Sequence, residues 1–291
     1  MELRELRYFL AVAREENISK AAELLFIAQP SLSRQMQNLE KEIGKPLFVR
    51  GGKKITLTEA GVLLRKRAEE ILSLYEKTEA ELLSAEENIG GTVLIGCGES
   101  YTIETVAKAA KHLQKDHPDI RFEFFSGDGV TVSEMLDKGL IDFGVLVKPA
   151  DLSKFEYVLL PQTDTWGVLM KKDSPLSEKP FISPEDLHDL PLILSKQSMR
   201  KNEISEWYKK DLQSLNIVAT YNLIYNASLL VKSGLGYAVG LDKIINTTGN
   251  SELTFRPLKP KLETSLAFAW KRYQVFSKPA ELFLNKLKEV L

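Results

Sequence analysis

The stretch that decides the fold is Ala-Gln-Pro-Ser-Leu-Ser-Arg-Gln-Met-Gln-Asn-Leu-Glu-Lys, residues 28–41. Pro30 predicts a helix that begins near this residue, because the missing N–H of proline costs nothing in the first turn of a helix. At ~100° per residue, Leu32, Met36 and Leu39 lie within about 60° of one another and form a buried face. The opposite face is polar and presents Pro30, Ser33, Arg34, Gln37 and Lys41, with Asn38 at its edge.

The polar face of this helix has two interpretations. Its side chains are of the types that hydrogen-bond to base edges and pair with phosphates, which is typical of a DNA recognition helix. A surface helix in a three-helix bundle would show the same pattern with a solvated outer face. The residues of the helix alone leave both interpretations open.

Two helical segments precede this stretch. Ser19 is a good N-cap for a short helix over Lys20 to about Phe26, and residues 27–29 then form a tight turn before the polar helix. Two short helices with such a connection describe a helix-turn-helix. The earlier helix has apolar residues at the i, i+3, i+4, i+7 spacing of one helix face, namely Leu6, Phe9, Leu10 and Ala13.

A cationic hairpin is predicted directly after these helices. Residues 47–50 and 53–57 read as two strands joined by a turn at Gly51 and Gly52. The hairpin carries Arg50, Lys53 and Lys54. A hairpin of this charge beside a polar helix indicates a wing that lies along a phosphate backbone, and this neighbourhood favours the DNA-binding interpretation.

The same residues resemble the LysR-type transcriptional regulators, and the resemblance is dense over residues 1–61. It implies a winged helix-turn-helix that binds double-stranded DNA, in which Gln29, Pro30, Ser33 and Arg34 lead the recognition helix. Arg50 and the two lysines would form the wing. We add Gln37 and Asn38 from the helix face to the candidate DNA-binding residues. The motifs are Ala-Ala-Glu-Leu-Leu at 21–25, Ala-Gln-Pro-Ser-Leu-Ser-Arg-Gln at 28–35, Leu-Glu at 39–40, Gly44, Pro-Leu-Phe at 46–48 and Leu-Thr-Glu-Ala-Gly at 57–61.

A long connecting helix is predicted from Glu59, capped by Thr58, to about Asn88. One interpretation is a dimerisation helix, since a long helix between two domains has little of its own chain to pack against. The other is a helix packed on its own domain. The resemblance implies the first arrangement, and a homotetramer built as a dimer of dimers. Residues spaced alternately by four and three form a possible heptad seam: Leu64, Ala68, Ile71, Tyr75, Thr78, Leu82 and Ala85.

The remaining chain predicts an α/β region in two lobes. Strand, helix and strand alternate from residue 92 onward, which indicates βαβ units and a mainly parallel sheet. The pattern restarts after Pro161, and a late strand at 265–270 returns before a terminal helix. The resemblance implies an effector domain similar in fold to periplasmic binding proteins. We therefore expect a DNA-binding domain at 1–58, a linker helix at 59–89 and an effector domain at 90–291, with lobe I at 92–162 and 264–291 and lobe II at 163–263.

Candidate effector-binding residues follow the predicted strands, where open α/β sheets bind ligands. Ser100 matches a hydroxyl position that the family often uses, and Thr102 lies beside it, although an ordinary helix cap explains both equally well. The loops after other strands contribute Asp128, Lys148, Ser198 and Arg200. Free N–H groups at helix starts favour a small anion such as a carboxylate, whereas Glu99 and Asp128 oppose a highly charged anion if they face the cleft.

Composition constrains the remaining possibilities. The 291 residues have a formal net charge of −1, but residues 1–58 hold 10 basic and 7 acidic side chains, residues 59–88 hold 4 and 8, and residues 89–291 hold 25 of each. The mild basic excess therefore falls on the predicted DNA-binding domain. Its small size indicates that a single wing domain binds DNA weakly.

Several classes of protein and site are disfavoured. Cys97 is the only cysteine, and it is interpreted as a buried structural thiol. The three histidines lack metal-ligand spacing, and no window is long enough for a membrane span. We expect a cytoplasmic regulator without a metal or cofactor. An enzyme or binding protein built on the α/β region is the alternative, but no nucleophile–base pair, phosphate loop or metal cluster supports catalysis.

Overall fold

The computed structural model divides the chain into two compact units, Met1–Leu83 and Ser84–Leu291. It describes residues 1–51, 54–83, 89–200, 203–209 and 214–291. Each unit is built around hydrophobic clusters of its own.

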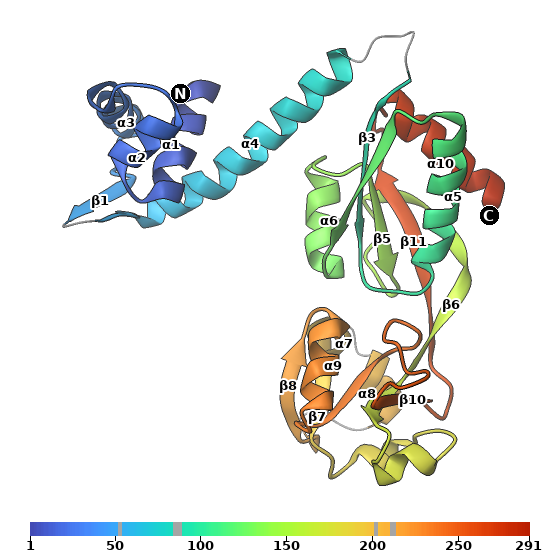
Figure 1. Ribbon diagram of the computed structural model, residues 1–291. Helices are drawn as coiled ribbons and strands as arrows, with labels where there is room; N and C mark the ends of the chain where they lie inside the picture. Colours follow the sequence, from blue (N-terminus) through green and yellow to red (C-terminus); the bar gives the residue numbers. More distant parts are fainter. Residues whose placement is uncertain (52–53, 84–88, 201–202, 210–213) are drawn as a thin grey trace. The chain divides into compact units, whose positions relative to one another are not determined.

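The first unit opens with three helices, α1 (Leu3–Glu15), α2 (Ile18–Leu24) and α3 (Gln29–Ile43) (Figure 1). The helix-turn-helix is therefore present, with two local corrections. Asn17, not Ser19, caps α2, because its Oδ1 accepts the N–H groups of Ser19 and Lys20 at 2.9 and 3.1 Å. Gln29 lies inside α3 instead of in the turn before it. The three helices bury a shared core that includes Leu6, Phe9, Val12, Ala21, Leu32, Met36 and Leu39.

The hairpin follows as β1 (Phe48–Gly51) and β2 (Lys54–Leu57). The strands pair antiparallel, with Phe48 opposite Leu57 and Gly51 opposite Lys54. The predicted two-strand wing is confirmed, although Gly51 belongs to the first strand. Phe48 also packs on Phe9, with ring centroids 5.3 Å apart, so the hairpin is anchored in the core of the helices.

Helix α4 (Glu59–Leu83) begins after Thr58, whose hydroxyl accepts the N–H of Gly61 at 3.0 Å, as a capping residue does. Its first half packs on its own unit. Ala68 is fully buried and Leu72 is 7% exposed in the core of the first unit. The heptad seam is thus wrong at Ala68, since this side chain is covered within the monomer, and Ala85 lies outside the described residues.

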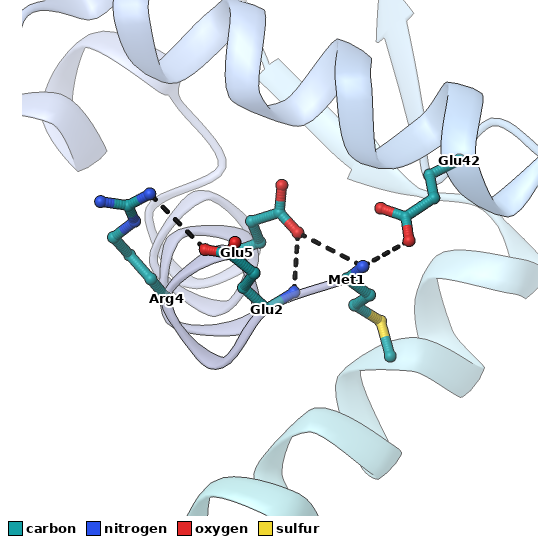
Figure 2. A network of polar contacts seen from close by, with 5 residues as sticks. All are labelled: Met1, Glu2, Arg4, Glu5 and Glu42. Atoms are coloured by element: carbon teal, nitrogen blue, oxygen red, sulfur yellow. Dashed lines mark hydrogen bonds and ion pairs between the residues drawn. The ribbon is translucent and has the colours of Figure 1, made fainter.

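A small network of charged groups joins the start of α1 to the end of α3 (Figure 2). The terminal ammonium of Met1 contacts the carboxylates of Glu42 and Glu5, and the backbone N–H of Glu2 donates to Glu5 at 2.8 Å. Arg4 pairs with Glu2 at 3.6 Å. These groups are mostly solvent-exposed, so water and salt screen them and they add little to stability.

The first half of the second unit is a mixed sheet covered by helices. Strands β3 (Gly91–Cys97), β4 (Ile120–Ser126) and β5 (Phe143–Val147) are parallel, as the βαβ pattern predicted. Helices α5 (Ile103–Asp116) and α10 (Lys278–Val290) lie side by side on one face, and their apolar residues form one cluster with the sheet (Figure 1). Helix α6 (Gly129–Asp137) covers the other face.

The two halves of the second unit share two long antiparallel strands, β6 (Phe155–Lys171) and β11 (Glu263–Lys271). Residues 155–165 of β6 pair with β11, whereas residues 166–171 pair with β9 (Tyr237–Leu241) and β10 (Leu253–Pro257). The chain thus crosses between the halves twice, near residues 163–165 in β6 and near residues 263–265 in β11. Both crossings lie within strands that pair with each other.

The second half contains β7 (Leu192–Ser195), β8 (Ile217–Tyr221), the helices α7 (Lys196–Arg200) and α8 (Glu203–Tyr208), and α9 (Ile224–Lys232). Two short 3₁₀ helices, η1 (Pro175–Glu178) and η2 (Pro184–Leu187), precede β7. Sequence patterns missed β8, β10 and the first part of β6. Ser198 and Arg200, expected in a loop after a strand, lie in the short helix α7. None of the helices in the described part of the chain is long and apolar enough to cross a membrane.

Candidate functional site

The outer face of α3 is the first candidate site. Gln29, Pro30, Arg34, Gln37 and Asn38 are solvent-exposed, and Ser33 is half-buried. Leu32, Met36 and Leu39 are fully buried on the opposite face. The predicted division of this helix into a buried apolar face and an exposed polar face is confirmed, and all six candidate DNA-binding residues of the helix lie on or beside one accessible surface.

Glu40 fixes the hairpin to the same helix. Its Oε1 accepts the backbone N–H groups of Leu47 and Phe48, at 2.8 and 3.1 Å. Hydrogen bonds to a carboxylate are stronger than neutral ones, so the end of α3 and the start of β1 are held together at a defined spacing. Sequence patterns placed Glu40 in a family motif but assigned it no contact.

Among the three wing cations, the structure describes the side chain of Lys54. Lys54 Nζ lies 2.7 Å from Oε2 of Glu16, which is the C-cap residue of α1. This lysine is thus engaged within the protein, although it is also 75% exposed. The backbone of Arg50 lies in β1, but its side chain is outside the described structure, and Lys53 is outside the described residues altogether.

The second candidate site is a pocket in the second unit with a volume of about 70 Å³. Its wall combines loops of the first half with strands and helix starts of the second half. It is lined by Gly98, Glu99, Gly127, Asp128, Val147, Trp166, Ser195, Gln197, Ser198, Tyr221, Asn222, Ile224, Leu241 and Ile244.

Two of the predicted effector residues, Asp128 and Ser198, line this pocket. Ser100, Thr102 and Lys148 are not among its lining residues. The side chain of Arg200 is outside the described structure. Sequence patterns missed Trp166, Tyr221 and Gln197 as lining residues. The two aromatic residues lie within or at the end of a strand, where a buried aromatic looks like any core position until the opposite half of the domain is placed beside it.

The hydroxyls of Ser100 and Thr102 have an internal role. Both side chains are buried, and both donate to the carboxylate of Asp164, from Thr102 Oγ1 at 3.0 Å and from Ser100 Oγ to the other oxygen. Burial raises the pKa of Asp164, and the two hydroxyl donors oppose that shift. In this structure the two hydroxyls solvate a buried carboxylate of β6, and their direct contact with an effector stays a prediction.

Two hydrogen bonds cross between the halves at the pocket. The backbone N–H of Gly129, at the start of α6, donates to Oε1 of Gln197 at 2.8 Å. The backbone N–H of Ile224, at the start of α9, donates to the carboxylate of Glu99. Burial raises the pKa of Glu99, while the backbone donors Ile224 and Tyr225 act to lower it. These two hydrogen bonds join the halves beside the pocket, so a movement of the halves apart would break them.

Cys97 ends β3 near the pocket and is 7% exposed. Burial raises the pKa of its thiol, the hydrogen bond with Ser126 opposes the shift, and the charge of Glu99 adds to it. The described residues contain no group of three or more His, Cys, Asp or Glu side chains that could hold a metal ion.

Two protein-family models match this chain, one in each unit. Residues 3–62 match the model of bacterial regulatory helix-turn-helix proteins of the lysR family, and residues 86–291 match the LysR substrate binding domain. The chain is 30% identical to a probable RuBisCO transcriptional regulator of Synechocystis sp. over 242 residues, which are 81% of this chain and 70% of that protein.

Two further similarities extend over the full length. The HTH-type transcriptional regulator BsdA of Bacillus subtilis is 29% identical over 295 residues, which are 98% of this chain and 99% of BsdA. The crystal structure of CbnR, a LysR family transcriptional regulator, superimposes with a TM-score of 0.78 at 18% identity, covering 100% of this chain and 99% of CbnR. At that identity the likeness to CbnR establishes the fold alone.

Proposed function

This chain belongs to the LysR family of DNA-binding transcriptional regulators, and on that premise we propose which of its residues bind DNA and which hold the small-molecule effector. The exposed face of α3 reads base edges in the major groove, through Gln29, Pro30, Ser33, Arg34, Gln37 and Asn38. The hairpin positions the unit on the phosphate backbone through Arg50, Lys53 and Lys54. The observation that carries this proposal is the polar, accessible face of α3 beside a hairpin anchored by Glu40.

Arg34 is the residue that we expect to contribute most to sequence recognition. It is exposed on the leading half of α3, and arginine commonly forms two hydrogen bonds to one guanine. Arg34→Ala should weaken binding to the cognate site by ~1–3 kcal/mol while changing binding to random DNA much less. Quantitative footprinting on the intergenic DNA upstream of the chain's own gene measures both affinities.

Arg7→Ala provides a matched control, since it removes the same charge from the same unit. Arg7 lies on α1 and faces α4, with its guanidinium 3.6 Å from Glu76 and 5.8 Å from the ring centroid of Tyr75. This control should leave sequence preference unchanged. If Arg34→Ala and Arg7→Ala reduce specific and random binding by equal factors, the assignment of α3 as the reading helix is wrong.

The effector pocket is the one lined by Asp128, Ser198 and the contacts between the two halves. We propose that ligand binding there changes how far the halves close, and so changes the DNA complex. The contacts Gly129–Gln197 and Ile224–Glu99 support this proposal, because they join the halves across the pocket. A small molecule that binds the chain tightly but leaves the footprint and transcription unchanged would count against this mechanism.

We further propose that the chain works as a homo-oligomer. A stripe of apolar side chains stays exposed on α4 after its other face has packed on the first unit, and this stripe includes Leu63, Ile71, Leu74, Tyr75 and Leu82. Paired α4 helices would cover it, as in the dimer of dimers that the family resemblance implies. An interrupted inverted repeat would then be the DNA target.

The proposed division of labour is DNA binding by residues 1–58, linkage by 59–89 and effector binding by 90–291, with lobe I at 92–162 and 264–291 and lobe II at 163–263. We infer that the chain is not an enzyme and that it acts in the cytoplasm, where bacterial DNA lies. The relatives reported above are named as transcriptional regulators, which supports a regulatory role over a catalytic one.

A further inference from the structure

The effector pocket has an acidic and acceptor-rich wall. Glu99 and Asp128 both line it, and no lysine, arginine or histidine is among its lining residues within the described part of the chain. The remaining wall combines aliphatic and aromatic side chains, among them Val147, Ile244 and the indole of Trp166, with neutral polar ones, namely Ser195, Gln197, Ser198 and Asn222. Any ligand in this pocket meets two carboxylates and no described cation. These carboxylates repel an anion and attract a cation.

Two of the helix starts beside the pocket, those of α6 and α9, are already occupied by carboxylates of the chain. Glu99 accepts the N–H of Ile224 at the start of α9. Asp128 caps α6 and accepts the N–H and the hydroxyl of Thr131, each at 2.9 Å. Helix N-termini are the usual anion sites of such clefts, and here both offer their N–H groups to internal carboxylates instead of to a ligand.

Two of the hydroxyls in the wall, those of Tyr221 and Ser198, donate away from the pocket. Tyr221 Oη donates to the carbonyl of Val239 at 2.7 Å, and Ser198 Oγ donates to the carbonyl of Ser195 at 2.9 Å. A hydroxyl that has used its proton still has lone pairs to accept with. These two oxygens therefore add acceptors to the wall, and they supply no proton to a ligand.

Trp166 supplies a buried donor that has no partner. Its side chain lines the pocket and is 5% exposed, and within the described residues its Nε1 is the buried side-chain polar atom with no hydrogen-bond partner. The other two tryptophans satisfy their indoles, with Trp207 donating to the carbonyl of Pro260 at 2.7 Å and Trp270 to Glu156 at 3.0 Å. A buried N–H without a partner is costly, and a ligand acceptor in the pocket would remove that cost.

We propose that this pocket binds a small protonated primary amine that also carries one hydrogen-bond acceptor. Its ammonium group lies among the carboxylates and hydroxyl oxygens, where its three donors find acceptors, and its acceptor meets the indole N–H of Trp166. The short carbon chain between them packs on the aliphatic wall, and the aromatic faces favour a cation. The pocket volume of about 70 Å³ favours a small ligand. The inference rests on the proposed function only for the regulatory role of the pocket.

Four probes of matched size test this ligand class on the full chain: 3-methoxypropylamine, pentylamine, 1-pentanol and butyrate. Titration calorimetry and tryptophan fluorescence report binding. We expect 3-methoxypropylamine to bind best and pentylamine several-fold more weakly. The alcohol and the acid should be at least ~10-fold weaker than pentylamine, which corresponds to about 1.4 kcal/mol.

Variants connect each preference to a residue. Asp128→Asn and Glu99→Gln keep an acceptor at each helix start, and either should weaken both amines at least ~10-fold while leaving 1-pentanol unchanged. Trp166→Phe should abolish the advantage of 3-methoxypropylamine over pentylamine. Glu263→Gln removes an exposed carboxylate of the same unit outside the pocket, and it should change nothing.

The proposal is wrong if butyrate binds more tightly than either amine. It is also wrong if the unmodified chain binds neither amine more tightly than 1-pentanol and butyrate. An amine preference that survives both carboxylate variants would overturn it equally. The proposed function is tested separately, by DNA footprinting of the chain in the absence of the four small molecules. Intact DNA recognition together with an acid-selective pocket refutes only the ligand class, whereas amine binding without DNA recognition refutes only the regulator assignment.

Discussion

Lys54 of the wing is bound to Glu16, with Nζ and Oε2 2.7 Å apart and both side chains largely in solvent. The hydrogen bond to Lys54 lowers the pKa of the Glu16 carboxylate, and the same bond raises the pKa of Lys54. The backbone supports the pairing, because the N–H of Ile55 donates to the carbonyl of Glu16 at 2.9 Å. A phosphate that used Lys54 would therefore compete with an internal carboxylate.

We predict that Glu16→Gln strengthens DNA binding. The substitution removes one negative charge near the wing and releases Lys54 for a phosphate contact. Binding should become tighter for all sequences, and the slope of log affinity against log salt should steepen by up to ~1, the value for one added phosphate contact. Titration of fluorescent DNA at several salt concentrations measures this slope.

Lys54→Ala is the matching control for that prediction. It should weaken binding and flatten the salt slope only slightly, because the lysine is already partly neutralised. In the double variant the gain from Glu16→Gln should disappear. A gain that persists without Lys54 would mean that the carboxylate repels DNA directly and that the ion pair is irrelevant.

The two sides of α4 should respond differently to truncation. Leu72 is 7% exposed in the core of the first unit, whereas Leu74 is 44% exposed on the apolar stripe. Leu72→Ala should destabilise the first unit by ~2–5 kcal/mol, the usual cost of a cavity in a core. Leu74→Ala should leave calorimetric unfolding nearly unchanged and should weaken self-association in sedimentation experiments. Equal oligomer stability in the Leu74 variant and the unmodified chain would remove α4 from the interface.

Asp164 should make the second unit less stable as pH rises. Its raised pKa means that the folded chain holds the proton more tightly than the unfolded chain does. The stabilisation is complete below the unfolded pKa of about 3.9 and is lost as pH rises through the higher folded value. Asp164→Asn should abolish this component of the pH dependence. It should also cost ~1–3 kcal/mol, because an amide has one acceptor oxygen for the two hydroxyls of Ser100 and Thr102.

Urea unfolding monitored by tryptophan fluorescence between pH 4 and 7 measures both effects, since all three tryptophans lie in the second unit. Glu263→Gln is a suitable comparison. The pKa of Glu263 is lowered by Lys261, so its own contribution has the opposite sign and is lost as pH falls. An unchanged pH profile in Asp164→Asn would show that this carboxyl keeps an ordinary pKa.

Cys97 should react slowly with thiol reagents in the native chain. The reactive species is the thiolate, and burial both raises the pKa of this thiol and restricts access to it. Labelling with a disulfide reagent at pH 7.5 should be at least ~10-fold slower than in denaturant. Rapid labelling of the native chain, or peroxide-dependent loss of DNA binding that Cys97→Ser abolishes, would instead identify a redox role.

Local sequence patterns were sufficient for most elements. The apolar spacing of Leu32, Met36 and Leu39 predicted the orientation of α3, and the glycines between two short β-branched runs predicted the hairpin. These features depend on the period of a helix or strand and on the chemistry of a few neighbouring residues, so a short window contains them. The βαβ alternation of the second unit was visible for the same reason. The edges of some elements differ from the prediction, since Gln29 lies inside α3 and residues 196–200 form α7.

The sequence by itself determined the winged helix-turn-helix, the two α/β halves and the polar face of α3, because backbone periodicity and turn chemistry act within about ten residues. Only the tertiary structure decided that Ser100 and Thr102 solvate Asp164, that Lys54 is bound to Glu16, and that Trp166 lines the pocket without a hydrogen-bond partner. Each of these facts joins residues or elements far apart in the chain. Burial and distance across a fold decide hydrogen bonds and pKa shifts, and a linear pattern contains neither quantity.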